Sequence, residues 1–207
     1  MIEVFSQKTA YLLRDALASQ ARLRYRVFVE SRKLPHDHFD GMEYDPFDTP
    51  AARYLVWRDE SATVRGLMRV MPTNLPYMLQ RYWPHLVKDG HLPCSPQVWE
   101  LTRGCVDKGV VPERRARIVP ELLCGMQDLF ERLGVRSVIG VSRPRLISTY
   151  IRSGVRWLGE PDLVEGQIEA AFAVPTEHIR PILHCYKLNI EKPVLSPVGL
   201  DDFMLAA

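Results

Sequence analysis

A short acidic segment carries the residues of this chain best suited to chemistry. Glu43, Asp45 and Asp48 fall within six residues, beside a glycine, a proline and two aromatic side chains. The segment has neither helical nor strand periodicity, and solvated acidic loops rarely include such large aromatic side chains. We therefore expect an ordered loop that presents negative charge to a cationic group.

A second candidate is the tetrad Glu100-Leu101-Thr102-Arg103. The alternation of residues 97–106 predicts a strand with Glu100 and Thr102 on one face and Leu101 and Arg103 on the other. A carboxylate on a central strand is costly when it is unpaired, so Glu100 needs a partner or a chemical role. Two interpretations stay open: a structural ion pair with an arginine, or a general base that acts directly or through one water.

Arginines elsewhere in the chain suggest partners for negative charge. Arg69 and Arg103 lie on different predicted strands, and both could reach the acidic loop and lock it into an ion-pair network, which would be structural. A separate run, Arg114-Arg115-Ala116-Arg117, precedes a predicted helix over residues 118–133. Free backbone N–H groups and guanidinium groups there suit a phosphate or pyrophosphate, although a solvated turn explains the same residues.

Two further patterns favour no site. His36-x-His38 has acidic neighbours and looks like a metal site, but no further histidine falls at matched spacing, so we expect no metal. Cys105 and Ser142 lack an evident histidine partner, which disfavours covalent catalysis.

Length and composition bound the class of protein. The chain has 207 residues, which suits a single domain over residues 1–207. Its formal net charge of +2 does not by itself indicate nucleic acid, and no apolar run approaches ~18 residues, so we expect neither a nucleic-acid nor a membrane partner. The four cysteines form no CxxC pair, and the first residues lack the order of a secretory signal. These features predict reduced thiols and a cytoplasmic protein.

The succession of patterns predicts one α/β domain with a mixed sheet. Predicted helices cover residues 9–28, 118–133 and 144–152, and a long irregular loop covers residues 30–50. Predicted strands cover residues 1–5, 54–57, 64–70, 97–106, 135–141 and 170–174.

Eight spaced positions jointly resemble the LuxI-type acyl-homoserine lactone synthases, the enzymes that make autoinducers for bacterial quorum sensing. The positions are Arg24, Phe28, Glu43, Asp45, Asp48, Arg69, Glu100 and Arg103. Length and element order match as well, so the resemblance covers essentially the whole chain. It implies a three-layer α/β/α sandwich with a mixed central sheet, related to N-acetyltransferases, and an acyltransferase that uses no cofactor.

The resemblance also implies the reaction. The substrates are S-adenosylmethionine and an acyl thioester, carried by acyl carrier protein or by coenzyme A. The amine of S-adenosylmethionine attacks the thioester carbonyl to give an amide. The methionyl carboxylate then displaces methylthioadenosine as the lactone ring closes.

Residue roles follow from the same resemblance. It implies that Glu100 is the base, that Asp45 faces the amine, and that Arg103 holds the substrate carboxylate or orients Asp45. The implied S-adenosylmethionine-binding residues are Arg24, Phe28, Leu34, Met42, Glu43, Asp45, Asp48, Arg69 and Arg103. The expected walls of the acyl pocket are Leu101, Thr102, Met126, Val141, Ser142 and Trp157.

The chain departs from the family pattern at three places, of which one is mild: Trp83 stands where the family commonly has phenylalanine. Leu34 stands where the family usually has a tryptophan that helps to enclose S-adenosylmethionine. Ser142 stands near a strand end where relatives that accept 3-oxo chains often have threonine, so a 3-oxo preference is poorly supported. The large side chains of Trp157 and Met126, if they line the pocket, favour a short, branched or aryl acyl group.

The acyl carrier and two alternative functions stay open. The arginines Arg143, Arg145, Arg152 and Arg156 could dock an acidic carrier protein or meet the phosphates of coenzyme A. One alternative is an N-acetyltransferase-like acyl-CoA transferase that acts on a different amine. The other is a non-catalytic effector-binding module, in which Glu100 and the arginines are structural.

Overall fold

The computed structural model describes residues 1–148, 151 and 154–184, which fall into two compact units. Among these residues, unit 1 comprises residues 1–69 and 103–126, and unit 2 comprises residues 70–102 and 127–184. Three elements contribute residues to both units: β5 (Val64–Pro72), β6 (Val98–Val106) and α3 (Pro112–Leu133).

Unit 1 contains a sheet in the order β1 (Glu3–Phe5), β4 (Arg53–Arg58), β5 and β6. Its other elements are a 3₁₀ turn (Ala10–Leu13), α1 (Ala16–Arg24), a π-helical segment (Tyr25–Ser31), β2 (His38–Phe39) and β3 (Met42–Glu43). Strand β1 is antiparallel to β4, with Val4 opposite Leu55. A hydrogen bond links β5 to the residue that follows β6: the Asp107 N–H donates to the Arg65 carbonyl at 2.7 Å.

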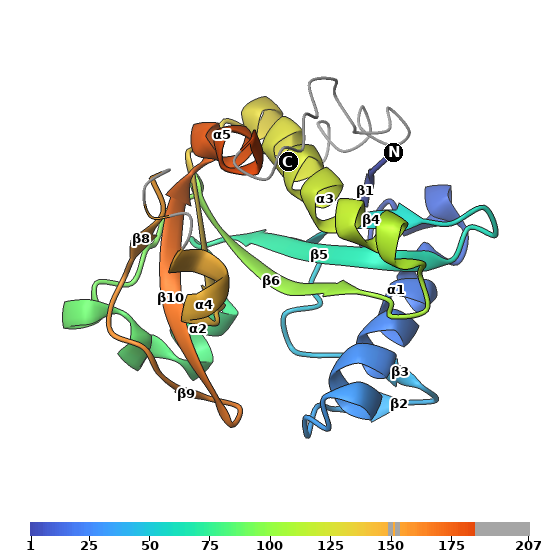
Figure 1. Cartoon of the computed structure of the whole chain (residues 1–207), viewed down its shortest axis with the longest axis horizontal. Helices are drawn as coiled ribbons and strands as arrows, with labels where there is room; N and C mark the ends of the chain where they lie inside the picture. The colour runs from blue at the N-terminus through green and yellow to red at the C-terminus, as the bar shows by residue number, and fades with distance from the viewer. Residues whose placement is uncertain (149–150, 152–153, 185–207) are drawn as a thin grey trace. The chain divides into compact units, whose positions relative to one another are not determined.

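Helices cover both faces of the unit 1 sheet, with α3 on one side of β5 and α1 on the other (Figure 1). A β-carbon at Gly66 would overlap the Ile118 side chain of α3, so α3 lies directly on this face. Leu67 points to the opposite face. There it joins a buried apolar cluster with Leu23 of α1 and Phe28 of the π-helical segment. Unit 1 thus has the helix–sheet–helix layering that the sequence predicts.

Unit 2 contains the mixed part of the sheet. Its elements are α2 (Met78–Tyr82), 3₁₀ turns (Pro84–Leu86, Lys88–Gly90 and Thr176–His178), β7 (Ser137–Ser142), α4 (Pro144–Ile147), β8 (Arg156–Trp157), β9 (Asp162–Val164), β10 (Gln167–Pro175) and α5 (Ile179–His184). Strand β6 is parallel to β7, whereas β10 is antiparallel to β7, β8 and β9. The predicted α/β class with a mixed sheet is therefore confirmed.

The long helix begins earlier than the sequence pattern predicts. Residues 118–133 were expected, but α3 runs from Pro112. A proline at the first helical position and Glu113 in the first turn both favour a helix start there. The prediction was wrong because the first turns of α3 are polar, so the apolar periodicity starts only at Ile118.

The segment between α1 and β4 is more regular than expected. Residues 30–50 were expected to be irregular, but they contain the β2–β3 hairpin. Asp40 and Gly41 form its two-residue turn, and both have positive φ, at 50° and 68°. An Asp-Gly pair is a strong signal for such a turn, and it was present in the sequence.

Other predicted helices differ from the structure in length. Residues 9–28 were expected to form one helix, but α1 is preceded by a 3₁₀ turn and followed by the π-helical segment. The predicted helix over 144–152 corresponds to α4, and part of that range lies outside the described residues. Within the described part of the chain, no helix is both long and apolar enough to cross a membrane.

The Gly66 contact generates a test of the unit 1 packing. We expect Gly66→Ala to lower the free energy of unfolding by about 1–3 kcal/mol, because the added methyl group overpacks the interface with Ile118. Gly104→Ala is the matched control, since a β-carbon at Gly104 of β6 meets nothing within 4 Å. Urea unfolding of both variants measures the difference, and equal effects would contradict this packing.

Candidate active site

The acidic segment of unit 1 meets three arginines from three different elements. Arg24 is the last residue of α1, Arg69 lies on β5 and Arg103 lies on β6. The carboxylates are Glu43 on β3 and Asp45 and Asp48 in the loop that follows it. The structure therefore brings together six of the expected residues, with three positive and three negative side chains.

Arg24 is the centre of this cluster and its side chain is fully buried. Its Nη1 and Nη2 donate to the two oxygens of Asp48 at 2.7 and 2.9 Å, which is a bidentate pair. Its Nε donates to Glu43 Oε2, and its Nη2 lies 3.4 Å from Asp45 Oδ2. One guanidinium group thus contacts all three carboxylates.

Arg69 approaches the same loop from the sheet. It is also fully buried, and its Nη1 donates to Asp45 Oδ1 at 2.6 Å and to Asp48 Oδ1 at 2.9 Å. Asp48 accepts further hydrogen bonds from the Tyr54 hydroxyl at 2.6 Å and from the Asp45 backbone N–H at 2.9 Å. Asp48 is therefore held from the helix, the sheet and its own loop.

Arg103 completes the cluster from an unusual backbone conformation. Its φ is 53°, in the left-handed region that a non-glycine residue in a strand rarely adopts. Its Nη2 lies 2.9 Å from Glu43 Oε1 and 2.7 Å from Asp45 Oδ2. Such strain occurs preferentially at functional sites, and here it turns the side chain toward the acidic loop.

The ion pairs set the charge of the buried groups. Burial alone raises the pKa of Glu43, but contacts with His36, Arg24 and Arg103 outweigh it and lower that pKa to about 2. For Asp48 the effect of burial is likewise outweighed by Arg24, Arg69 and the Tyr54 hydroxyl, and its pKa is lowered. Glu43 and Asp48 are therefore carboxylates at neutral pH.

Exposure separates the fully buried residues of the cluster from those that could meet a ligand. The side chains of Arg24, Arg69 and Glu43 are 0% exposed, whereas those of Asp45, Arg103 and Asp48 are 7%, 8% and 11% exposed. These three residues thus form the accessible edge of the cluster. Asp48 is bonded by both Arg24 and Arg69, whereas Asp45 and Arg103 present a negative and a positive group side by side.

Glu100 lies in unit 2, where it is buried and anchors a helix. Its Oε2 accepts a hydrogen bond from the Met78 N–H at 2.9 Å, and its Oε1 accepts one from the Leu79 N–H at 2.6 Å. These are the first two residues of α2. The carboxylate therefore positions α2 through backbone groups, a structural role that the sequence did not indicate.

Three further residues expected at the S-adenosylmethionine site lie in unit 1. The guanidinium groups of Arg32 and Arg103 both lie over the Phe28 ring, at 5.2 and 5.5 Å from its centroid. Leu34 is partly buried against the apolar cluster. Met42 accepts a hydrogen bond on its sulfur from the Tyr44 hydroxyl at 3.2 Å.

The residues expected to line an acyl pocket do not share one face. Strand register places Leu101 opposite Gly140, Gly140 opposite Phe172, and Phe172 opposite Trp157. Thr102, Val141 and Ser142 also belong to unit 2, but by alternation Thr102 and Val141 point to the other face, with Glu100. Met126 belongs to α3 in unit 1 and is buried.

Phe172 is a unit 2 residue that the sequence reasoning missed. A β-carbon at Gly140 would lie 3.0 Å from Phe172 Cζ and 3.1 Å from the Leu101 carbonyl oxygen. The phenyl ring therefore covers the backbone at Gly140, and a larger residue there would displace it. A glycine inside a strand pattern is the signal that could have revealed this close approach.

The arginine run at α3 is engaged within the chain. Arg114 lies in the first turns of the helix, where it bonds both oxygens of Glu121 at 3.0 and 3.3 Å and stacks over the Trp57 ring at 4.6 Å. Arg115 donates to the Lys108 carbonyl at 3.0 Å. The expectation that these arginines precede the helix was wrong, since α3 starts at Pro112.

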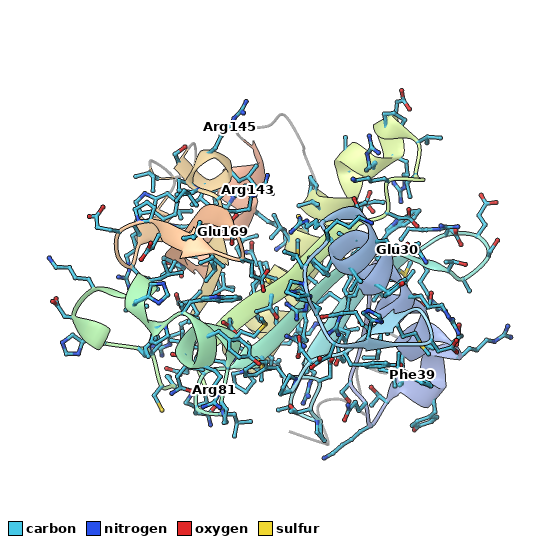
Figure 2. The ribbon with its side chains drawn as sticks, turned by 90° about the horizontal axis from the view of Figure 1, so that it is seen from below. Glu30, Phe39, Arg81, Arg143, Arg145 and Glu169 are labelled. Carbon is cyan, nitrogen blue, oxygen red and sulfur yellow. The ribbon has the colours of Figure 1, made fainter. Side chains whose placement is uncertain are left out.

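The other arginine group is exposed. Arg143, Arg145 and Arg156 are exposed side chains of unit 2, and Arg152 lies outside the described residues. Figure 2 shows Arg143 and Arg145 at α4, with the Arg145 side chain directed outward.

The histidine pair has partners other than a metal. His36 Nδ1 lies 3.2 Å from Glu43 Oε1, whereas the His38 ring packs edge-on against Tyr25. Among the described residues, no group of three or more histidine, cysteine or acidic side chains is placed to hold a metal ion. Cys105 is buried, and burial raises its pKa to about 12, which makes it a poor nucleophile.

Comparison with known proteins establishes the class of protein to which this fold and this cluster belong. Residues 9–180 match the autoinducer synthase family model, and the chain belongs to that family. An acyl-homoserine-lactone synthase of Pseudomonas aeruginosa is 30% identical over 183 residues, which cover 84% of this chain and 87% of the relative. An isovaleryl-homoserine lactone synthase of Bradyrhizobium diazoefficiens is 30% identical over 172 residues, covering 80% and 75% of the two chains.

Solved structures agree with this assignment. A CoA-dependent acyl-homoserine lactone synthase, BjaI, solved with S-adenosylmethionine and isopentyl-CoA, has a TM-score of 0.80 and 26% identity, covering 95% of this chain and 92% of that one. An acyl-CoA N-acyltransferase from Pseudomonas aeruginosa, 16% identical, has a TM-score of 0.55 over 84% and 99% of the chains, which supports the N-acetyltransferase-like fold alone.

The function expected from the sequence is confirmed by these relatives. The chain is an acyltransferase of the acyl-homoserine-lactone synthase type, an enzyme of quorum sensing. The alternatives, transfer to a different amine and a non-catalytic binding module, are not favoured.

The burial of Arg24 generates a test of the cluster. We expect Arg24→Met to lower the free energy of unfolding by about 3–5 kcal/mol, because it leaves the buried carboxylates of Glu43 and Asp48 without their main partner. Arg22→Met, in the same helix, is the control, since the Arg22–Asp15 pair is solvent-exposed and should change stability by less than about 1 kcal/mol. Thermal and urea unfolding measure both, and similar losses would contradict the structural role of Arg24.

Proposed function

We propose that this synthase joins S-adenosylmethionine to an acyl group delivered as a thioester. The accessible pair formed by Asp45 and Arg103 carries this proposal. The amino acid end of S-adenosylmethionine has an ammonium and a carboxylate side by side, and the pair offers the opposite charges in the same arrangement. The bound S-adenosylmethionine in the structure of BjaI supports the same substrate for this chain.

The proposed reaction has two steps that balance in atoms and charge. The neutral amine attacks the thioester carbonyl, so a C–N bond forms, the C–S bond breaks and the carrier leaves as a thiol that takes up a proton. The methionyl carboxylate then attacks the carbon beside the sulfonium, which closes the lactone and releases neutral methylthioadenosine. S-adenosylmethionine is consumed, so it is a substrate rather than a cofactor.

Each site residue has a distinct role in this proposal. Asp45 accepts hydrogen bonds from the ammonium, and Arg103 holds the carboxylate or orients Asp45. Glu43, Asp48, Arg24 and Arg69 hold the loop, while Phe28, Leu34 and Met42 contribute to the S-adenosylmethionine side of the site. Leu101, Ser142 and Trp157 share one face of the unit 2 sheet and are the proposed contacts of the acyl group. The other expected contacts, Thr102, Val141 and Met126, do not lie on that face.

The base of the first step is proposed to be Glu100. An ammonium must lose a proton before it can attack, and a buried carboxylate can accept that proton directly or through one water. The two N–H groups of α2 that bond Glu100 would hold the carboxylate in one orientation while it does so.

The acyl donor, the domain organisation and the cellular location of the enzyme complete the proposal. Acyl-CoA and acyl carrier protein are both kept as donors, since exposed arginines such as Arg143 and Arg145 suit either phosphates or an acidic protein. Residues 1–207 are proposed to act as one domain, which is supported by β5, β6 and α3 contributing to both units. The three described cysteines are free thiols, which fits a cytoplasmic enzyme.

Release of methylthioadenosine tests the proposed function. The purified chain should release it from S-adenosylmethionine in step with acyl-homoserine lactone when it is given a suitable acyl-CoA or acyl-carrier thioester. Comparing kcat/KM for one short branched acyl group on the two carriers identifies the donor. Failure to release methylthioadenosine with any donor in a panel of chain lengths would contradict the proposal.

Replacement of Glu100 tests its proposed role as base. We expect Glu100→Gln to slow single-turnover amide formation by about 100-fold or more while the Kd for S-adenosylmethionine changes little. Glutamine also places an NH₂ group against an N–H of α2, so stability is measured alongside.

Thr73→Val is the matched control, because it removes two hydrogen bonds in the same unit without touching Glu100: the one that Thr73 Oγ1 donates to the Ser95 carbonyl and the one that it accepts from the Ser95 N–H. Full turnover in Glu100→Gln, or an equal rate loss in the control, would assign Glu100 to structure alone.

A further inference from the structure

His36 contacts the acidic cluster at the point where Glu43 and Arg103 meet. Its Nδ1 lies 3.2 Å from Glu43 Oε1, the same oxygen that lies 2.9 Å from Arg103 Nη2. The other oxygen of Glu43 is bonded by Arg24. Since a carboxylate oxygen has two lone pairs, Oε1 can accept from both the imidazole and the guanidinium group.

The imidazole also packs against the ring that supports Arg103. The centroids of the His36 and Phe28 rings are 5.8 Å apart, and the Arg103 guanidinium carbon lies 5.5 Å from the Phe28 centroid. His36 therefore restrains Arg103 in two ways, through the shared carboxylate oxygen and through the aromatic ring. Its side chain is only 11% exposed, so it is held in this place.

The hairpin turn explains how His36 reaches this position. His36 precedes β2. The backbone oxygen of the next residue, Asp37, accepts a hydrogen bond from the Tyr44 N–H at 3.1 Å, which extends the hairpin beyond the paired residues. Glu43 is the inward-facing residue of β3. The imidazole and the carboxylate thus come from the two arms of one hairpin.

We propose that His36 is a positioning residue that fixes Glu43 and Arg103 in the geometry that binds S-adenosylmethionine. The role rests on the proposed function, because it assigns Arg103 and Asp45 to that substrate. In this role the imidazole acts through Nδ1, which lies 3.2 Å from Glu43 Oε1, and the three carboxylates and three arginines of the cluster balance one another in charge.

Calorimetric binding of S-adenosylmethionine, without any acyl donor, tests this role. We expect His36→Ala to raise the Kd by about tenfold, the size of effect given by losing one hydrogen bond to a charged group. His36→Asn should restore the Kd to within about threefold, since the asparagine NH₂ group can replace Nδ1 as donor. His38→Ala is the matched control, because His38 contacts Tyr25 instead, and its Kd should stay at the wild-type value.

The outcomes separate this inference from the proposed function. If the wild-type chain binds no S-adenosylmethionine, the proposed function fails. If it binds and His36→Ala binds equally well, the positioning role alone is wrong. An equal loss in His36→Asn would also overturn the role, because the donor would then be irrelevant.

Nitrogen NMR of the wild-type histidines gives a second readout, which does not depend on a change in affinity. A proton on Nδ1 of His36, assigned by loss of its signals in His36→Asn, supports the donor role. A bare Nδ1, with the proton on Nε2, would overturn it.

Discussion

The burial of the Arg24 guanidinium group is the constraint on which the arrangement of unit 1 depends. A cation removed from water is costly unless every donor finds an acceptor and opposite charge lies close by. Arg24 sits at the end of α1, so its partners have to be brought to it, and the chain brings Glu43 and Asp48. The loop is therefore ordered by the arginine that it surrounds.

The rest of the cluster follows from that ordering. Once Asp48 is fixed by Arg24, its remaining lone pairs accept Tyr54 and Arg69, which ties the loop to β4 and β5. Asp45 is left at the edge, where its oxygens contact Arg69 and Arg103. Most of the charge in this region thus serves to hold Asp45 and Arg103 in place, and their side chains, like that of Asp48, are partly accessible.

Two positions show strain or burial that local structure alone does not favour. Arg103 occupies left-handed backbone in a strand, where glycine is the usual residue, and its contacts with Glu43 and Asp45 offset that cost. Glu100 is a buried carboxylate that accepts two backbone N–H groups at the start of α2. Glu100, the proposed base, therefore also holds part of the fold.

The sequence by itself determined the class of the protein and the membership of the cluster. The α/β class with a mixed sheet follows from hydrophobic periodicity, and the charges of Glu43, Asp48, Arg69 and Arg103 imply pairing, because such side chains are rarely buried alone. The family resemblance added Arg24 to this set. Only the tertiary structure decided which of these groups brace the loop, that Glu100 bonds α2, that Phe172 covers Gly140, and that His36 joins Glu43. These contacts join residues far apart along the chain or on opposite arms of a hairpin, and local periodicity carries no information about such distances.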